Sequence, residues 1–318
     1  MGRRAAETIL HGIVAAIVVM MLLRAQRIRG PEARLRFWLL AMVLPLAGTP
    51  LLWCFAPWRQ GEHFRDDWAL FSASHLAPWA WHGVELASAA AWLWALAGTA
   101  LFLRDVIPFV LDFLRGRVTR PGATTPAPDL TSAAMRAAAA LGTAVPRLAV
   151  LVSEHPILMC RGLRRPFLVA STGLCEMLAP DELEAAIAHE MAHAKHRDPV
   201  LGWGLMLVRG LCFFNPAVQL AARAAVLEIE RRADQSAARI VGGTEAVVKS
   251  LRKLSGLDPS TPPLPARALT WHGFRLAAIE DRCQTLLREE QQAPARLAGW
   301  ILPTTAIGLG VILLLTVA

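Results

Sequence analysis

Four long segments of this sequence contain no aspartate, glutamate, lysine or arginine, and they constrain the fold more than any other feature. A helix of about 20 predominantly apolar residues is long enough to cross the hydrocarbon core of a bilayer. The chain is also 55% hydrophobic and only 18% charged, which is typical of membrane proteins. We therefore predict a mainly α, integral membrane protein with about four transmembrane helices, in the segments Thr8–Leu23, Phe37–Trp58, Leu86–Leu103 and Leu297–Ala318.

The first apolar segment also has features of a signal peptide, because Arg3 and Arg4 precede a short apolar core. The residues that follow it, Leu22–Arg27, do not form a small-residue cleavage site. We therefore favour a transmembrane helix over a cleaved signal.

Arginine counts in the connecting loops predict the orientation of the chain in the membrane. Residues 24–36 contain five arginines and one acidic residue, whereas residues 59–85 contain two arginines and four acidic residues. Further arginines follow the third segment, so we expect the first and third connections in the cytoplasm and the second outside. Arg3 and Arg4 on an outer N-terminus oppose this orientation weakly. The net charge of +8 suits anionic lipid headgroups, and no recognition helix or aromatic–basic platform predicts direct nucleic-acid binding.

The chain divides into four parts at changes in composition. Residues 1–116 form an N-terminal membrane region with three transmembrane helices, and residues 117–130, rich in proline and threonine, form a linker. Residues 131–295 have the size of one domain, and residues 296–318 form the last transmembrane helix. Because the domain lies between the third and fourth spans, we expect it to face the cytoplasm.

The predicted domain mixes helices with short strands, each recognised by its apolar spacing and its flanking turn residues. Residues 200–222 are apolar but interrupted, and they are either a helical hairpin that dips into or lies against the membrane or a buried core hairpin. The strands are Arg147–Val152, Pro156–Cys160 and Pro166–Ser171, and the helices are Ser132–Leu141, a helix with Asp181 as N-cap, Pro216–Val241 ended by Gly242 and Gly243, and Phe274–Gln292.

The sequence His189-Glu190-Met191-Ala192-His193 lies in the helix that follows Asp181. On a helix, His189 and His193 share one face about one turn apart, so two imidazoles can bind one Zn²⁺. Glu190 beside them can take a proton from a water molecule. The competing interpretation is a pair of surface histidines on an amphipathic helix, and a third ligand is needed to decide.

A pair of carboxylates on the 216–241 helix can supply that ligand. Glu230 and Asp234 are four residues apart and therefore lie on one helix face. One carboxylate can bind a metal ion while the other hydrogen-bonds a ligating histidine. Alternatively the two carboxylates form a solvated charged face with Arg231 and Arg232, which lie between them.

These motifs, taken in order, resemble the BlaR/MecR-type membrane zinc metallopeptidases. The resemblance rests on HExxH, on His196-Arg197-Asp198, on Phe213-Phe214-Asn215-Pro216, and on Glu230-x-x-Ala233-Asp234. The heat-shock and Ste24-like membrane metallopeptidases share the HExxH and ExxAD parts. The resemblance implies a cytoplasmic, α+β, zincin-like metallopeptidase domain. It also implies that zinc is bound by His189, His193 and Glu230, with Glu190 as general base and Asp234 supporting a ligand.

The sequence departs from the family pattern at several points. Related peptidases stabilise the oxyanion of the tetrahedral intermediate with a Tyr, His or Arg side chain, and this chain has no tyrosine. We therefore assign this catalytic role to His272. The alternatives are Arg275, Arg231 or zinc alone. Glu228 has no counterpart, and we expect it to be a solvated charge. BlaR/MecR proteins also carry an extracellular penicillin-binding domain, whereas this sequence stops at Ala318, so the resemblance does not imply antibiotic sensing.

The leading hypothesis is a zinc endopeptidase of the cytoplasmic (inner) membrane that hydrolyses a cytosolic protein, such as a transcriptional repressor. A second hypothesis is a quality-control protease for membrane proteins, as in the heat-shock branch. A third is a signalling or scaffold protein with a non-catalytic zinc site. The first two predict a protein or peptide substrate and the lipid bilayer as partners, and replacing Glu190 separates them from the third.

Overall fold

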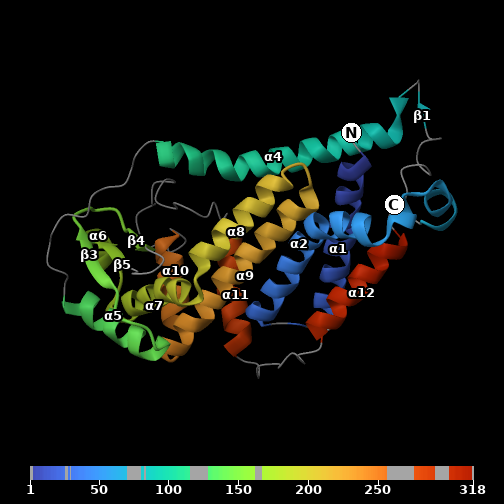
Figure 1. Ribbon diagram of the computed structural model, residues 1–318. Helices are drawn as coiled ribbons and strands as arrows, with labels where there is room; N and C mark the ends of the chain where they lie inside the picture. Colours follow the sequence, from blue (N-terminus) through green and yellow to red (C-terminus); the bar gives the residue numbers. More distant parts are fainter. Residues whose placement is uncertain are drawn as a thin grey trace. The chain divides into compact units, whose positions relative to one another are not determined.

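The computed structural model is mostly helical in its described residues, with a three-stranded sheet and a short two-stranded one, which confirms the mainly α expectation (Figure 1). The structure describes residues 3–25, 28, 30–69, 80–81, 84–114, 128–161, 167–255, 276–290 and 301–316. The described chain divides into two compact units. Unit 1 comprises residues 1–110, 204–228 and 295–318, and unit 2 comprises residues 111–203 and 229–294.

Unit 1 contains the helices expected to span the membrane. Helix α1 (Arg3–Ala25) packs against α2 (Pro31–Phe55), and α12 (Ile301–Thr316) contacts both. Two short helical turns, η1 (Pro57–Gln60) and η2 (Phe64–Trp68), follow α2. The strands β1 (Ala80–Trp81) and β2 (Val84–Glu85) pair antiparallel before α4 (Leu86–Leu114).

Two described helical segments are long and apolar enough to cross a bilayer, Thr8–Ala25 in α1 and Ala89–Ile107 in α4. The described parts of α2 and α12 do not meet the same criterion of length and hydropathy. The structure therefore supports a membrane-associated helical protein, and the four-span topology stays a prediction.

Helices α8 (Asp198–Leu211) and α9 (Pro216–Val241) form the predicted helical hairpin (Figure 1). Its turn is organised by Asn215, whose Oδ1 accepts a hydrogen bond from Ala217 N–H at 3.1 Å. The Asn215 Nδ2 donates to the carbonyl of Thr8 in α1 at 3.0 Å. The amide of Asn215 is fully buried, so both of its polar groups are satisfied inside unit 1.

A charged cluster joins α4 to this hairpin within unit 1. Asp105 accepts hydrogen bonds from Arg209 Nη2 at 2.6 Å and from Arg223 Nε at 3.1 Å. Arg209 also donates to Gln219 Oε1 at 2.9 Å, and Gln219 returns bonds to the carbonyls of Arg209 and Cys212. A partly buried polar network of this kind favours one arrangement of its elements, because its buried groups Arg209 and Gln219 would be unsatisfied without their partners.

Glu228 is not the solvated charge that the sequence analysis expects. It is 1% exposed, and its Oε1 accepts a hydrogen bond from Arg34 Nε on α2 at 2.7 Å. The expectation was wrong because the partner lies 194 residues away in the sequence, and helix periodicity carries no information about such a partner.

Unit 2 is built on a three-stranded sheet with β5 in the centre. Strand β3 (Arg147–Leu151) pairs parallel with β5 (Phe167–Ser171), and β4 (Leu158–Arg161) pairs antiparallel with the other side of β5. The three predicted strands are therefore confirmed. Leu168 and Ala170 of β5 are fully buried, as expected for a central strand.

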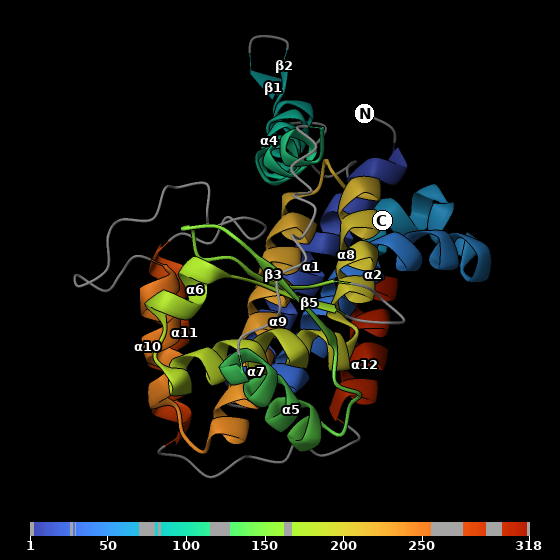
Figure 2. The same ribbon diagram turned by 90° about the vertical axis from the view of Figure 1, so that its left-hand side faces the viewer.

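Helix α7 (Pro180–His196), which carries the HExxH sequence, is packed on both sides (Figure 2). It contacts α5 (Pro128–Leu141) and α10 (Glu245–Leu254). Its buried stripe includes Leu183, Ile187 and Met191, the positions that the helical spacing predicts. The remaining helices of unit 2 are the short α6 (Thr172–Met177) and α11 (Leu276–Glu290).

The first turn of α7 differs from the expectation that Asp181 is its N-cap. The helix begins at Pro180, with Ala179 as N-cap, because the fixed φ of proline suits the first helical position. Glu182 then accepts a hydrogen bond from Ala179 N–H at 2.9 Å. At the other end, Arg197 has φ +56°, which separates α7 from α8.

Candidate metal centre

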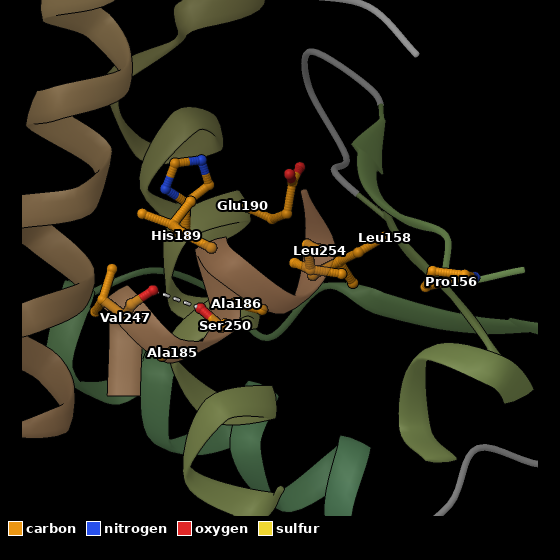
Figure 3. Close-up of a pocket in the computed structure, with 10 residues that line it drawn as sticks. Pro156, Leu158, Ala185, Ala186, His189, Glu190, Val247, Ser250 and Leu254 are labelled. Atoms are coloured by element: carbon orange, nitrogen blue, oxygen red, sulfur yellow. Dashed lines mark hydrogen bonds between the residues drawn. The ribbon is translucent and has the colours of Figure 1, made fainter. Parts of the chain in front are cut away.

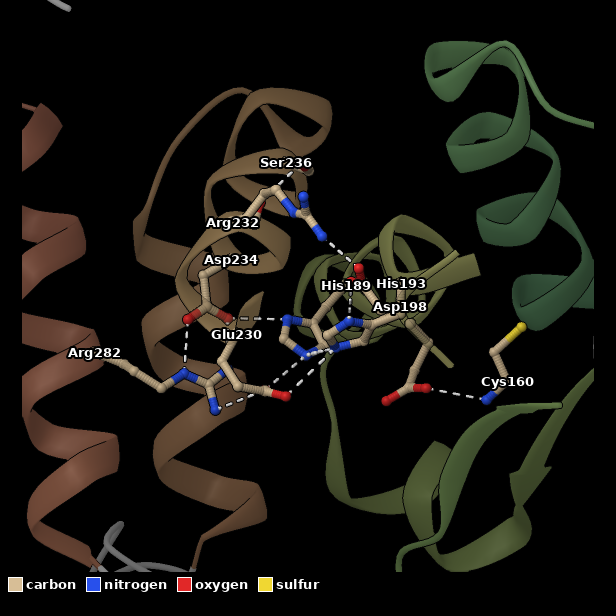
Figure 4. A network of polar contacts seen from close by, with 10 residues as sticks. Cys160, His189, His193, Asp198, Glu230, Arg232, Asp234, Ser236 and Arg282 are labelled. Atoms are coloured by element: carbon tan, nitrogen blue, oxygen red, sulfur yellow. Dashed lines mark hydrogen bonds and ion pairs between the residues drawn. The ribbon is translucent and has the colours of Figure 1, made fainter. Parts of the chain in front are cut away.

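Three potential ligand atoms converge between α7 and α9 in unit 2 (Figure 4). The Nε2 atoms of His189 and His193 face each other at 3.1 Å. Glu230 Oε2 lies 3.5 Å from His189 Nε2, and Glu230 Oε1 lies 3.7 Å from His193 Nε2. All three ligand atoms lie within 4.8 Å of one another. The structure thus brings together the two histidines and the carboxylate that the sequence analysis assigned to zinc.

Each histidine is held by a second carboxylate on its other ring nitrogen. Asp234 Oδ1 lies 2.9 Å from His189 Nδ1, and Asp198 Oδ2 lies 2.8 Å from His193 Nδ1. A carboxylate beside Nδ1 keeps the proton on that nitrogen and leaves the lone pair on Nε2. Both Nε2 atoms therefore point into the same space, where they can bind one cation.

Two guanidinium groups hold these carboxylates in turn. Arg282 on α11 donates from Nε and Nη2 to the two oxygens of Asp234, both at 2.7 Å, and its Nη1 lies 3.1 Å from Glu230 Oε2. Arg232 forms the corresponding ion pair with Asp198 Oδ1. Arg282 and Asp234 are 5% and 0% exposed, so this pairing is almost completely removed from water.

The ionisation of the site favours a bound cation. Burial lowers the pKa of His189, but the contacts with Asp234 and Glu230 outweigh it and raise the pKa to about 10. Burial raises the pKa of Asp234, but Arg282 and His189 outweigh it and hold the pKa below its usual value. With the imidazoles left out of the sum, the three carboxylates and two guanidiniums leave one negative charge, and Glu190 adds another. The donor set and its charge therefore fit a dication such as Zn²⁺, which would replace the proton on His189.

Glu190 projects from α7 beside His189 (Figure 3). Its Oε2 accepts a hydrogen bond from the backbone N–H of Cys160 on β4 at 3.0 Å. Burial, together with the charge of Glu190, raises the pKa of the Cys160 thiol to about 12. The thiol is therefore protonated at neutral pH, and it is the backbone of β4 that orients Glu190.

The structure describes one of the three residues proposed to stabilise the oxyanion. His272 and Arg275 lie outside the described residues. The third candidate, Arg231, pairs through Nη2 with Asp281 Oδ2 at 2.6 Å. The assignment of His272 as a catalytic residue therefore stays a prediction.

Three residues of the site were missed as site residues by sequence reasoning. Asp198 stands in the resemblance motif five residues after His193, which was a usable signal for a histidine-orienting carboxylate. Arg282 ends the segment Ile279-Glu280-Asp281-Arg282, which resembles a segment of the heat-shock branch, but that resemblance assigned it no role. Arg232 carried no such signal, since an arginine in a charged helix is usually solvated. Only the folded chain identifies their carboxylate partners.

Comparison with known proteins agrees with these motifs. A model of the family described as BlaR1 peptidase M56 matches residues 92–245. A protease HtpX homolog from Janthinobacterium sp. (strain Marseille) is 25% identical over 160 residues, which are 38% of this chain and 55% of that protein. An HtpX homolog from Moorella thermoacetica is 39% identical over 75 residues, covering 23% of this chain and 25% of the relative.

The regulatory protein BlaR1 of Bacillus licheniformis is 27% identical over 88 residues, which are 27% of this chain and 14% of that protein. These matches confirm the predicted resemblance to the BlaR/MecR-type and HtpX-related membrane metallopeptidases. The chain spans about half the length, or less, of these curated relatives.

Proposed function

We propose that this relative of the BlaR1 M56 peptidases is a membrane-embedded zinc endopeptidase. One observation carries the proposal: two histidine Nε2 atoms and a buried carboxylate converge while a second carboxylate faces each Nδ1 atom. Two histidines on a solvated helix face would not need a carboxylate at each Nδ1 atom. The adjacent Glu190 supplies the proton acceptor that distinguishes a catalytic site from a structural one.

In this proposal His189, His193 and Glu230 hold the metal ion. When bound, zinc polarises a peptide carbonyl and makes a water molecule more acidic. Glu190 accepts the proton of the attacking water and later delivers it to the amine of the leaving peptide. The Cys160 N–H keeps the Glu190 carboxylate in place, and His272 is proposed to stabilise the oxyanion.

The proposed substrate is a cytosolic protein, such as a transcriptional repressor, and the proposed location is the cytoplasmic membrane with unit 2 on the cytoplasmic side. The name of the Bacillus licheniformis relative, a regulatory protein, supports a regulatory role. The alternative of a quality-control protease is supported by the matches to HtpX homologs. The two roles differ in the number of proteins cleaved.

Replacing Glu190 by glutamine tests the activity. Glu190→Gln keeps the shape of the side chain but cannot accept a proton, so we expect proteolysis to fall by roughly 100- to 10,000-fold. The zinc content, measured by mass spectrometry of the purified full chain in detergent, should be unchanged. Glu176→Gln on α6, where the side chain is exposed, is the matched control and should retain full activity.

Retained cleavage in Glu190→Gln would refute the assigned mechanism, and a wild-type chain that takes up no zinc would refute the metal site. The same variant identifies the substrate, since uncut protein should remain bound to it. One accumulating regulator in cells that carry the variant would support the repressor role. Many accumulating membrane proteins would support quality control.

A further inference from the structure

A cavity of about 150 Å³ lies directly beside His189 and Glu190 (Figure 3). Its walls come from α7, α10 and the strand β4 of unit 2. The cavity is therefore continuous with the proposed catalytic groups. A peptide placed for cleavage beside Glu190 would have a side chain within reach of this space.

On the α7 side, the cavity exists because two of the residues that line it are alanines, whose small side chains leave space. Ala185 and Ala186 line the cavity, and each lies four residues before one of the catalytic pair, His189 and Glu190. Residues four apart are stacked on one helix face, so the two alanines lie one turn below the catalytic side chains. Larger residues at these positions would fill the space.

The α10 wall is one apolar face of a short helix. Val247, Leu251 and Leu254 line the cavity together with Ser250, at the spacing that places residues on a single helix face. The Ser250 hydroxyl donates to the carbonyl of Val247 at 2.9 Å, so its donor is used within the helix. This wall offers a substrate mainly van der Waals contact.

An ion pair and the sheet fix the position of these walls. Lys253 Nζ on α10 lies 2.7 Å from Glu182 Oε2 on α7, and Glu182 is only 4% exposed. Leu158 of β4 closes the cavity on the side of the sheet. Two residues further along, Cys160 donates its backbone N–H to Glu190. The same strand thus borders the cavity and orients the proposed general base.

We propose that this cavity is a specificity pocket that receives an apolar side chain of the substrate, from a residue next to the cleaved peptide bond. The inference rests on the proposed endopeptidase function and names its substrate class. A cavity of this volume accommodates a group the size of benzene, which corresponds to a leucine, methionine or phenylalanine side chain. An acidic side chain is disfavoured by the neighbouring Glu190, and a lysine would lose its hydration against the apolar α10 face.

The test uses the purified, zinc-loaded full chain in detergent and a library of peptides derived from a bacterial proteome. Cleaved products are sequenced by mass spectrometry. We expect leucine, methionine and phenylalanine to be enriched at one position adjacent to the cleavage site. In a peptide pair that differs at this position, leucine should exceed glycine by roughly 10- to 100-fold in kcat/KM.

Two substitutions should change this preference in opposite directions. Ala186→Leu narrows the pocket and should shift the preferred residue to alanine or glycine, whereas Leu254→Ala enlarges it and should admit tryptophan. Ala140→Leu on α5 and Leu287→Ala on α11 make the same changes at exposed positions and should leave the profile unchanged.

The possible outcomes distinguish a wrong assignment of the pocket from a wrong assignment of the function. Cleavage by the wild-type chain without apolar enrichment would overturn the pocket assignment alone. The pocket assignment would also be overturned if Leu254→Ala retained wild-type zinc content and an unaltered cleavage profile. A zinc-loaded wild-type chain that cleaves no peptide would overturn the proposed function and the pocket with it.

Discussion

At the scale of single residues, Arg282 is the group on which the geometry of the metal centre most depends. Its guanidinium group binds both oxygens of Asp234 and contacts Glu230. One side chain therefore positions the proposed ligand Glu230 and also Asp234, the carboxylate that orients the proposed ligand His189. Removing one partner of a buried ion pair costs about 3–5 kcal/mol, because the remaining charge is uncompensated. Loss of support for a metal ligand weakens metal binding by roughly 10- to 100-fold.

We therefore expect Arg282→Met to lower both the thermal stability and the zinc affinity of the full chain. Arg282→Lys should recover part of the stability, because it restores the charge without the planar fork. Thermal unfolding and competition with a zinc chelator measure the two effects. Arg239→Met, at an exposed arginine of α9, is the control. An Arg282→Met chain with wild-type zinc affinity would contradict the positioning role.

The sequence indicates the proposed ligands and the supporting carboxylate of Asp234, but not the guanidinium group that holds this carboxylate. His189, His193 and Glu230 follow from spacing on two helices together with a family resemblance, and the structure brings all three together. Arg282 and Glu228 could not be interpreted in the same way. Their partners lie 48 and 194 residues away, and no local pattern encodes a contact between distant elements.

At the scale of elements, the end of α9 depends on one glycine. Gly242 has φ +79°, and a Cβ at this position would meet nothing within 4 Å. The only obstacle to a side chain is therefore the left-handed backbone, which costs other residues about 1–2 kcal/mol. We expect Gly242→Ala to destabilise unit 2 by about 1 kcal/mol, which lowers Tm by roughly 2–4 °C.

Gly202 is the matched control for this prediction. It lies inside α8, also without atoms close to its missing Cβ, and its φ is not positive. Gly202→Ala should raise stability by roughly 0.5–1 kcal/mol, because alanine loses less backbone entropy in a helix than glycine does. Thermal unfolding of the two variants should therefore shift in opposite directions. Equal shifts would show that the backbone conformation of Gly242 is not the cause.

Elements with a long apolar repeat or with clear flanking turn residues were predictable, and the short helix α10 was not. The span Pro216–Val241 and the three strands agree with the sequence-based boundaries to within a residue or two. Helix α10 was missed although it forms a wall of the proposed pocket. A ten-residue helix has too few turns for its periodicity to stand out, and its stability comes from packing on α7 rather than from propensity.

At the scale of the whole molecule, unit 1 leaves many large apolar side chains uncovered. Trp92, Leu93 and Leu96 on α4 are more than 60% exposed, and Leu207 on α8 is 64% exposed. Soluble proteins rarely expose contiguous apolar surface of this kind. The uncovered surface supports the prediction that α4 and the tip of the α8–α9 hairpin contact lipid. The charges of Asp105, Arg209 and Arg223, which are satisfied within unit 1, are compatible with such an environment.

The distribution of arginine in the loops predicts an orientation of the chain in the membrane that cysteine labelling can test. The loop 59–85 is predicted to lie outside the cytoplasm and α5 to lie inside. Glu62 and Met135 are both exposed residues of these two regions. In spheroplasts, a membrane-impermeant maleimide should label Glu62→Cys directly and should label Met135→Cys only after the membrane is permeabilised. Mass spectrometry of the labelled peptides separates these positions from the native cysteines. The reverse pattern would place unit 2 outside the cytoplasm, and a cytosolic repressor could then not be its substrate.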